Sequence, residues 1–253
     1  MTERGKILLL PLAFVVVWEV ASRNVGPGLA QLLPPPSSVL ADGWRVLGSG
    51  DLFGHIGHSL WRVFGGCAAA AIVGLPLGVG IGLWEPFEDV VDPVVEFLRP
   101  IPPIAWIPLG ILWFGIGDTQ NMFIIFLGAV FPIVLNTIAG VRGIDRTLVW
   151  GGFTLGGRPS QIVREIILPG ALPLILTGLR IGLGVGWMAL VAAELVAARS
   201  GLGFMIQSGR YAALTERVIL GMVVIGVLGL LMDYAMRWIE RRLAPWHAAM
   251  AGR

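Results

Sequence analysis

Long apolar segments separated by short polar ones dominate the hydrophobic pattern of this chain. A helix that crosses the hydrocarbon core of a bilayer needs about 20 mostly apolar residues. The segments that meet this description lie at about 5–23, 60–84, 100–117, 119–141, 171–196 and 216–238. The third begins among Pro100, Pro102, Pro103 and Pro108, so we expect an irregular entry there, with Asp118 in the tight turn to the fourth. The pattern predicts an all-α integral membrane protein with about six transmembrane helices.

The polar stretches predict how the chain is organised around these helices. We expect an N-terminal transmembrane helix within 1–32, a core with helices 2–6 over 60–247, and a short C-terminal tail at 248–253. Residues 33–59 place Leu40, Trp44, Leu47 and Phe53 among polar positions, which is typical of an amphipathic helix at the outer membrane interface. The basic start before an apolar stretch is also found in secretory signals, but no small-x-small cleavage site follows, which favours a membrane helix.

The positions of Lys and Arg predict the orientation, because cytoplasmic loops carry an excess of both. The cluster of Arg237, Arg241 and Arg242 follows the last predicted helix. With both termini cytoplasmic, most basic residues fall inside, Arg99 at the cytoplasmic end of the third helix among them. Arg62 then falls on the outside. We therefore expect a multi-pass protein with cytoplasmic N- and C-termini.

Composition agrees with this class: 56% of the residues are hydrophobic and 13% charged, whereas an ordinary soluble domain is about 25% charged. Cys67 is the single cysteine, so an intrachain disulfide framework is excluded. Lys6 is the single lysine and precedes Ile7, so the Gly-x4-Gly-Lys-Ser/Thr pattern of a P-loop ATPase is absent. We expect no catalytic residues, no nucleic-acid partner and contact with membrane lipid. His55 and His58 are interpreted as partly solvated residues, and no metal site is expected.

Two predicted helices carry glycine at every fourth position, which forms a smooth stripe where another backbone can approach closely. The stripes are Gly74, Gly78 and Gly82 in the second helix, and Gly178, Gly182 and Gly186 in the fifth. One interpretation is helix packing inside the subunit. The other is a subunit interface or a surface that lines a pathway.

The fifth helix also contains the ionisable residues Arg180 and Glu194, and an ionisable residue inside a membrane is a candidate functional residue. The two lie 14 residues apart, roughly 21 Å along a helix, so they cannot pair with each other. Arg180 could reach toward the cytoplasmic side, cap a neighbouring helix or attract an anion. Glu194 is expected to bond to a neighbour. Together with Trp187, these residues are our candidates for a translocation pathway.

The segment 145–169 between the fourth and fifth helices has the pattern of a helix–turn–helix: a short helix, a glycine turn, and a second amphipathic helix that starts near Pro159 and is expected to stop at Pro169. It resembles the EAA loop of ABC-importer permeases, which reads Glu-Ala-Ala, three residues, Gly, nine residues, Ile, one residue, Leu-Pro. Trp150, Gly151 and Gly152 occupy the Glu-Ala-Ala positions, and Gly156, Ile166, Leu168 and Pro169 follow at the family's spacings, with Arg158 just after the turn. Trp150 departs from the pattern, so an ion pair made by the family's Glu is in doubt.

Other segments are similar to permeases for sulfonates, nitrate and bicarbonate, and most of all to taurine permeases. They include Arg99–Pro108, Leu112–Asp118, Gly178–Trp187, Val191–Leu195, Gly201–Met205 and Arg241–His247. The resemblance implies a type I importer fold with a cytoplasmic coupling helix, in the plasma (inner) membrane of a prokaryote. It also implies a homodimer, two ATP-binding-cassette ATPase subunits that hold ATP and Mg, and an extracytoplasmic solute-binding protein. No cofactor is expected on this chain.

The implied function is import of a small anionic solute by alternating access, with taurine or an alkanesulfonate first and nitrate, bicarbonate or a vitamin precursor as alternatives. A secondary transporter and a membrane-embedded enzyme belong to other classes. A secondary transporter usually shows an internal repeat and its own coupling-ion residues. We find no convincing repeat and few intramembrane acids, which favours the importer.

Overall fold

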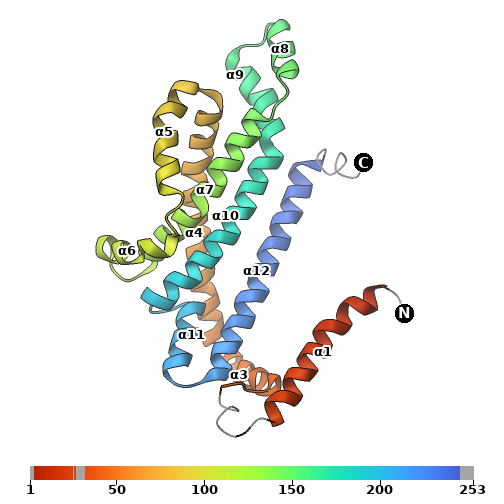
Figure 1. Cartoon of the computed structure of the whole chain (residues 1–253), viewed down its shortest axis with the longest axis vertical. Helices are drawn as coiled ribbons and strands as arrows, with labels where there is room; N and C mark the ends of the chain where they lie inside the picture. The colour runs from red at the N-terminus through yellow and green to blue at the C-terminus, as the bar shows by residue number, and fades with distance from the viewer. Residues whose placement is uncertain (1–2, 25, 27–31, 246–253) are drawn as a thin grey trace. The chain divides into compact units, whose positions relative to one another are not determined.

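The computed structural model describes residues 3–24, 26 and 32–245, with side chains from residue 11 onward. Within these residues the chain is helical and contains no strand (Figure 1), which confirms the predicted all-α class. The elements are α1 (Glu3–Asn24), α3 (Pro36–Ser49), α4 (Asp51–Leu83), α5 (Glu85–Leu98), η1 (Pro103–Trp106), α6 (Ile107–Phe114), α7 (Asp118–Arg142), α8 (Arg146–Thr154), α9 (Pro159–Ile162), η2 (Val163–Ile167), α10 (Leu168–Ala197), α11 (Leu202–Tyr211) and α12 (Thr215–Leu243). They form two compact units, Met1–Ser59 with Ser200–Val227 and Leu60–Arg199 with Leu228–Arg253, which we describe separately.

Four of the described helices are long and apolar enough to cross a membrane: α4, α7, the continuous helix Pro159–Ala197, and α12. The bent pair of α5 with Pro103–Phe114 makes a fifth if it counts as one broken span. The predicted spans at 119–141, 171–196 and 216–238 fall on α7, α10 and α12. The predicted first span, 5–23, falls on α1, where the side chains before residue 11 lie outside the described ones. The second begins at Asp51 rather than at 60, so α4 takes up the end of the predicted interfacial segment.

The prediction of one spanning helix at 100–117 is wrong. The chain forms α5 first, breaks at residues 99–102, and continues as a short 3-10 turn and the eight-residue α6, at 87° to α5. Prolines at 100, 102 and 103 cause the break, because proline has no backbone N–H to donate and its ring clashes with the preceding turn. An eight-residue helix extends only about 12 Å, too short to cross a bilayer.

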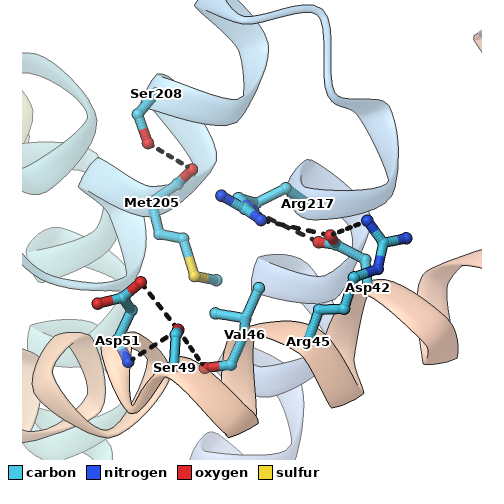
Figure 2. Close-up of polar contacts among 8 residues, drawn as sticks. All are labelled: Asp42, Arg45, Val46, Ser49, Asp51, Met205, Ser208 and Arg217. Atoms are coloured by element: carbon cyan, nitrogen blue, oxygen red, sulfur yellow. Dashed lines mark hydrogen bonds and ion pairs between the residues drawn. The ribbon is translucent and has the colours of Figure 1, made fainter.

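In the first unit, an ion pair joins α3 to the start of α12 (Figure 2). Arg217 lies 3.3 Å from the Asp42 carboxylate, and Arg45 reaches the same carboxylate from one turn further along α3. Asp42 is buried beside Val39, Gly43 and Val46 on the inner face of α3. Leu40 and Trp44 are exposed on the helix, so α3 is amphipathic, as its sequence pattern predicted.

In the same unit, α4 caps the start of α11. The Gly201 N–H donates to His55 Nδ1 at 3.1 Å, and the Leu202 N–H donates to Ser59 Oγ at 2.9 Å. The first N–H groups of a helix have no partner inside it, so these bonds satisfy two donors that would otherwise be left open. His55 therefore has a structural partner. The sequence pattern did not predict α11.

In the second unit α7 packs between α4 and α10, and the two glycine stripes make this possible (Figure 1). A Cβ added at Gly78 would lie 2.6 Å from Thr137 Cβ, and one added at Gly182 would lie 2.9 Å from the Ala129 carbonyl oxygen. Real Cβ atoms do not approach this closely, so larger residues would push the helices apart. Both stripes therefore face α7, the intrasubunit packing that was one of our two interpretations.

Candidate functional site

Residues 145–169, which we call the docking loop, form the candidate site, and α8 is its first helix. The Asp145 carboxylate accepts a hydrogen bond from the Thr147 N–H at 2.8 Å and so caps the start of α8. This bond holds the pKa of Asp145 below its ordinary value. Because the folded pKa is lowered, the contribution of Asp145 to the helix is present at neutral pH and is lost as the pH falls through that folded value.

A glycine turn ends α8 in a Schellman motif. The Gly157 N–H donates to the Gly152 carbonyl and the Gly156 N–H donates to the Phe153 carbonyl. Gly156 has φ +84°, in the left-handed region that glycine adopts without strain. A Cβ at this position would meet no atom within 4 Å, so the backbone conformation, rather than crowding, requires glycine here.

The two helices of the docking loop pack closely through Gly152. A Cβ added there would lie 2.5 Å from Ile162 Cδ1 and 2.8 Å from Ile166 Cδ1. The second Ala position of the EAA pattern therefore holds a residue that must be small. A Cβ at Gly151, by contrast, would meet nothing within 4 Å. The second helix is capped in turn, since the Arg158 N–H donates to Gln161 Oε1 at 2.9 Å.

The second helix of the docking loop was expected to stop at Pro169, but it does not. It continues through Leu168 and Pro169 into α10, so that Pro159–Ala197 is one helix of 39 residues. The junction is a π-helical turn, η2, in which the Leu168 N–H donates to the Val163 carbonyl. Pro169 cannot donate to the carbonyl four residues earlier, and widening the helix by one residue per turn relieves that conflict.

The outer face of the docking loop is apolar and exposed. Trp150 is 70% exposed and Leu155 is 91% exposed, with Leu148 also exposed on α8. Beside them lies a hollow of about 360 Å³ whose walls are Gly152, Leu155, Gly156, Gly157, Gln161, Ile162, Glu165 and Ile166. Exposed aromatic and aliphatic groups beside a hollow are typical of a protein–protein contact. Trp150 in place of the family's Glu thus presents an apolar surface where a charge is usual.

The docking loop is fixed to the ends of the long helices. Ile162 and Ile167 form a buried cluster with Val141 of α7 and Ala171 of α10, and Val79 of α4 packs against it. A Cβ at Gly170 would lie 2.6 Å from Ile144 Cδ1. Arg142 at the end of α7 pairs with Glu88 of α5 and donates to the Ile81 carbonyl at 3.1 Å. A movement of the docking loop would therefore carry these helix ends with it.

The structure places the three candidate pathway residues apart from one another. Arg180 Nε lies 2.7 Å from Asp233 Oδ1 of α12, and its Nη1 lies 3.7 Å from Glu240, so its charge is balanced within the unit. Trp187 is buried, and Gly229 of α12 leaves room for its ring. Glu194 is 1% exposed and bonds to a neighbour, Arg62, at 2.7 Å.

Arg62 is the residue that sequence reasoning missed. It was expected on the outer side, yet it is 2% exposed and joins three helices: α4, α10 through Glu194, and α7 through Asp118, whose Oδ1 lies 2.8 Å from Arg62 Nε. The count of basic residues treats each arginine as solvated, so it cannot detect a buried one. The signal available in the sequence was the presence of two acids near the ends of neighbouring apolar segments.

Comparison with known proteins identifies the family to which the chain is similar. Residues 70–245 match the model of the binding-protein-dependent transport system inner membrane component. The chain is 40% identical to the taurine transport system permease protein TauC of Escherichia coli (strain K12), over 94% of this chain and 88% of the relative. It is 37% identical to the putative aliphatic sulfonates transport permease protein SsuC of Bacillus subtilis (strain 168), over 98% and 89%. It is also 34% identical to the nitrate import permease protein NrtB of Synechocystis sp., over 91% and 86%.

Solved structures agree with the fold. A chain of the inward-facing MetNI methionine ABC transporter superposes with a TM-score of 0.68 at 24% identity, over 77% of this chain and 97% of that one. A chain of an amino acid ABC transporter with histidines superposes with a TM-score of 0.63 at 19% identity, over 78% and 96%. The helical fold, the docking loop and the match over most of the sequence lead to one conclusion: the chain belongs to the binding-protein-dependent transport system inner membrane component family, the permease subunits of ABC importers.

Proposed function

We propose that this permease imports a small organosulfonate, with taurine first, as a homodimer that works with two ATP-binding-cassette ATPases and an extracytoplasmic solute-binding protein. The observation that carries the proposal is the 40% identity to a taurine permease over 94% of the chain. Two further relatives are named for aliphatic sulfonates and are 37% and 38% identical. The docking loop supports the proposed work with ATPase subunits, because an exposed apolar helix fixed to the membrane helices is suited to receive motion from a soluble partner.

In this proposal the α8 face around Trp150 and Leu155 inserts into a groove on the ATPase. Closure of the ATPase dimer on ATP moves α8, and the buried cluster of Ile162, Ile167 and Val141 transmits the movement to α10 and α7. Tight packing makes this transmission efficient, since a packed interior passes on strain instead of absorbing it. The inner ends of the two permease subunits then move relative to each other, and access to the solute alternates between the two sides of the membrane.

Taurine uptake by a strain that lacks this chain tests the solute, with taurine as the sole sulfur source and no redundant system present. Loss of growth and of labelled taurine uptake, both restored by a plasmid copy, is expected. Normal uptake by the deletion strain would overturn the sulfonate assignment.

Hydrolysis of ATP by the purified chain tests its place in the complex. We expect no activity from the chain alone, because Lys6 is its single lysine and lies outside any P-loop pattern. Activity should appear on assembly with the ATPase subunits and rise with the solute-loaded binding protein. Hydrolysis by the chain alone, free of contaminants, would contradict the assignment.

Nitrate is the second candidate solute, because a nitrate permease is 34% identical over 91% of the chain. Nitrate carries one negative charge, as the sulfonate group of taurine does, so the same permease surfaces could serve both solutes. Uptake of labelled nitrate by the reconstituted complex, in competition with taurine, separates the two. Nitrate uptake that excess taurine leaves unchanged would favour this second function.

A further inference from the structure

A cavity of about 350 Å³ lies in the second unit, beside the break between α5 and η1. Its walls include Arg99 and Pro103 at the break, Gly128, Pro132 and Asn136 of α7, and Val185 of α10. This volume lies at the lower end of the range found for small-molecule sites, about 300–1,000 Å³. The wall is mostly apolar, with one charged and one amide side chain.

The cavity lies near the middle of the spanning helices. Pro132 and Gly128 are close to the centre of α7, which runs from Asp118 to Arg142, and Val185 is close to the centre of α10. From the positions of the basic residues, Arg99 was expected at the cytoplasmic end of the third predicted helix. The structure corrects this placement, because Arg99 follows the last residue of α5 and lines the cavity together with residues near the centres of α7 and α10.

Arg99 differs from the other arginines near the core of this unit. Arg62 is bound to Glu194 and Asp118, and Arg180 is bound to Asp233. No ion pair or hydrogen bond reaches the Arg99 side chain within the described part of the chain, and the residue is exposed. An unbalanced positive charge at membrane depth is costly, and such residues mark solute or ion pathways when they face a cavity.

The backbone at the cavity is a second, independent sign. Residues 99–102 are not helical, and three prolines between 100 and 103 remove N–H donors from the break. Irregular backbone at membrane depth is tolerated only where it is buried in protein or lines a cavity. Helices broken near mid-membrane beside a solute site are known in transporters, where the break opens space and backbone polar groups to the solute.

We propose that Arg99 binds the anionic group of the solute as it crosses the membrane, with Asn136 as a neutral polar neighbour in the same cavity. The inference rests on the proposed function and names the residue that recognises the charge. A guanidinium offers donors in a planar fork that suits the oxygens of a sulfonate or carboxylate. Asn136 Nδ2 donates to the Pro132 carbonyl at 2.8 Å, which fixes the orientation of its amide. Arg180, the earlier candidate, already has Asp233 as its partner.

The test uses the full complex with its ATPases and binding protein in proteoliposomes, with labelled taurine as the probe. Arg99→Gln and Arg99→Lys are compared with Arg241→Gln, which removes an exposed arginine at the end of α12. We expect Arg99→Gln to assemble and to keep ATPase stimulation by the binding protein, while taurine uptake per ATP hydrolysed falls at least about tenfold. Arg99→Lys should fall between Arg99→Gln and the unmodified chain, and Arg241→Gln should match the unmodified chain.

A charge-replacement experiment separates recognition from structure. In a Cys67→Ala background, Arg99→Cys is treated with a cationic or an anionic methanethiosulfonate. The cationic reagent should restore part of the uptake, the anionic one should not, and taurine should slow both reactions. Equal effects of the two reagents, full uptake by Arg99→Gln, or loss of assembly in Arg99→Gln would each overturn the proposal. Failure of the unmodified complex to import taurine would instead overturn the proposed solute. This outcome is distinguishable from failure of the Arg99 proposal, because it is seen in the complex that carries no substitution.

Discussion

At the scale of single residues, Arg62 and Glu194 form a buried ion pair in the second unit. Both side chains are almost fully buried, at 2% and 1% exposed, and their oppositely charged groups lie 2.7 Å apart. Burying two charges costs desolvation free energy. Removing one partner of a buried pair is strongly destabilising, because the other charge is then buried without compensation. The pair connects α4 to α10, so it constrains two of the long helices.

Glu194→Gln is expected to lower the stability of the purified subunit by about 3–5 kcal/mol, because Arg62 would keep its charge in a buried site. Asp118→Asn is the matched control: it removes the second acid near Arg62, but its side chain is 45% exposed, and its loss should cost under about 1 kcal/mol. Thermal unfolding in detergent measures both. Equal shifts in the two variants would show that burial does not set the strength of these contacts.

At the scale of elements, the docking loop was the part best predicted from the sequence. Its start at Asp145, its glycine turn and its second helix depend on residues within a few positions of one another, and local rules cover them. The π-helical turn and the continuation into α10 were not predicted, because they depend on how the chain accommodates Pro169 within a long packed helix. The function of the face around Trp150 stays a prediction.

Gly156→Leu is expected to assemble into the complex yet to lose most solute uptake. The left-handed backbone at Gly156 costs a side-chain-bearing residue roughly 1–2 kcal/mol, and the chain would relieve this by redirecting the second helix. Gly50→Leu is the control, because Gly50 also has positive φ and open space around it, at φ +81°, but ends α3. Recovered complex, ATPase stimulation and uptake are measured for both. Normal uptake in Gly156→Leu would show that the loop does not transmit the ATPase motion.

Asp145→Ala should weaken coupling, while Asp145→Asn should preserve it, because asparagine caps helices as well as aspartate does. The Asp145 carboxylate has a lowered pKa because it accepts the Thr147 N–H, so it stays ionised through the neutral range. Uptake by the unmodified chain and by Asp145→Asn is therefore expected to be alike at neutral pH. Acidification through the folded pKa should weaken only the unmodified cap. Uptake in proteoliposomes against internal pH checks this, and equal activity of Asp145→Ala would contradict it.

At the scale of the whole molecule, composition and apolar segments were enough to predict the class, and the spacing in 145–169 was enough to predict the family. Helix boundaries were less accessible. The end of α4 near Leu83 was predicted and its start at Asp51 was not, since polar residues between 51 and 59 continue a helix that apolar length alone does not reveal. The bent path through α5, η1 and α6 depends on a proline break whose angle no sequence pattern specifies.

The orientation of the chain in the membrane stays a prediction, and labelling can test it. In the Cys67→Ala background, a single cysteine at Gly50 should react with an impermeant reagent from outside intact cells. A single cysteine at Leu155, which is 91% exposed, should react only after the cells are opened. Reaction of Leu155→Cys from outside would place the docking loop on the wrong side for a cytoplasmic ATPase.

The π-helical turn at Val163–Ile167 fixes an angle as well as a connection. Each residue of an α-helix turns the chain by about 100°, so one residue more or less changes the direction in which everything beyond it points. The aim of Trp150 and Leu155 around the axis of α10 therefore depends on the residue count in this single turn. A one-residue deletion there would leave both ends of the helix chemically unchanged and rotate one against the other. In the proposed coupling, this turn therefore sets the rotational angle at which the docking loop meets an ATPase, and we expect chimaeras that exchange docking loops between permeases to work only where this turn has the same number of residues.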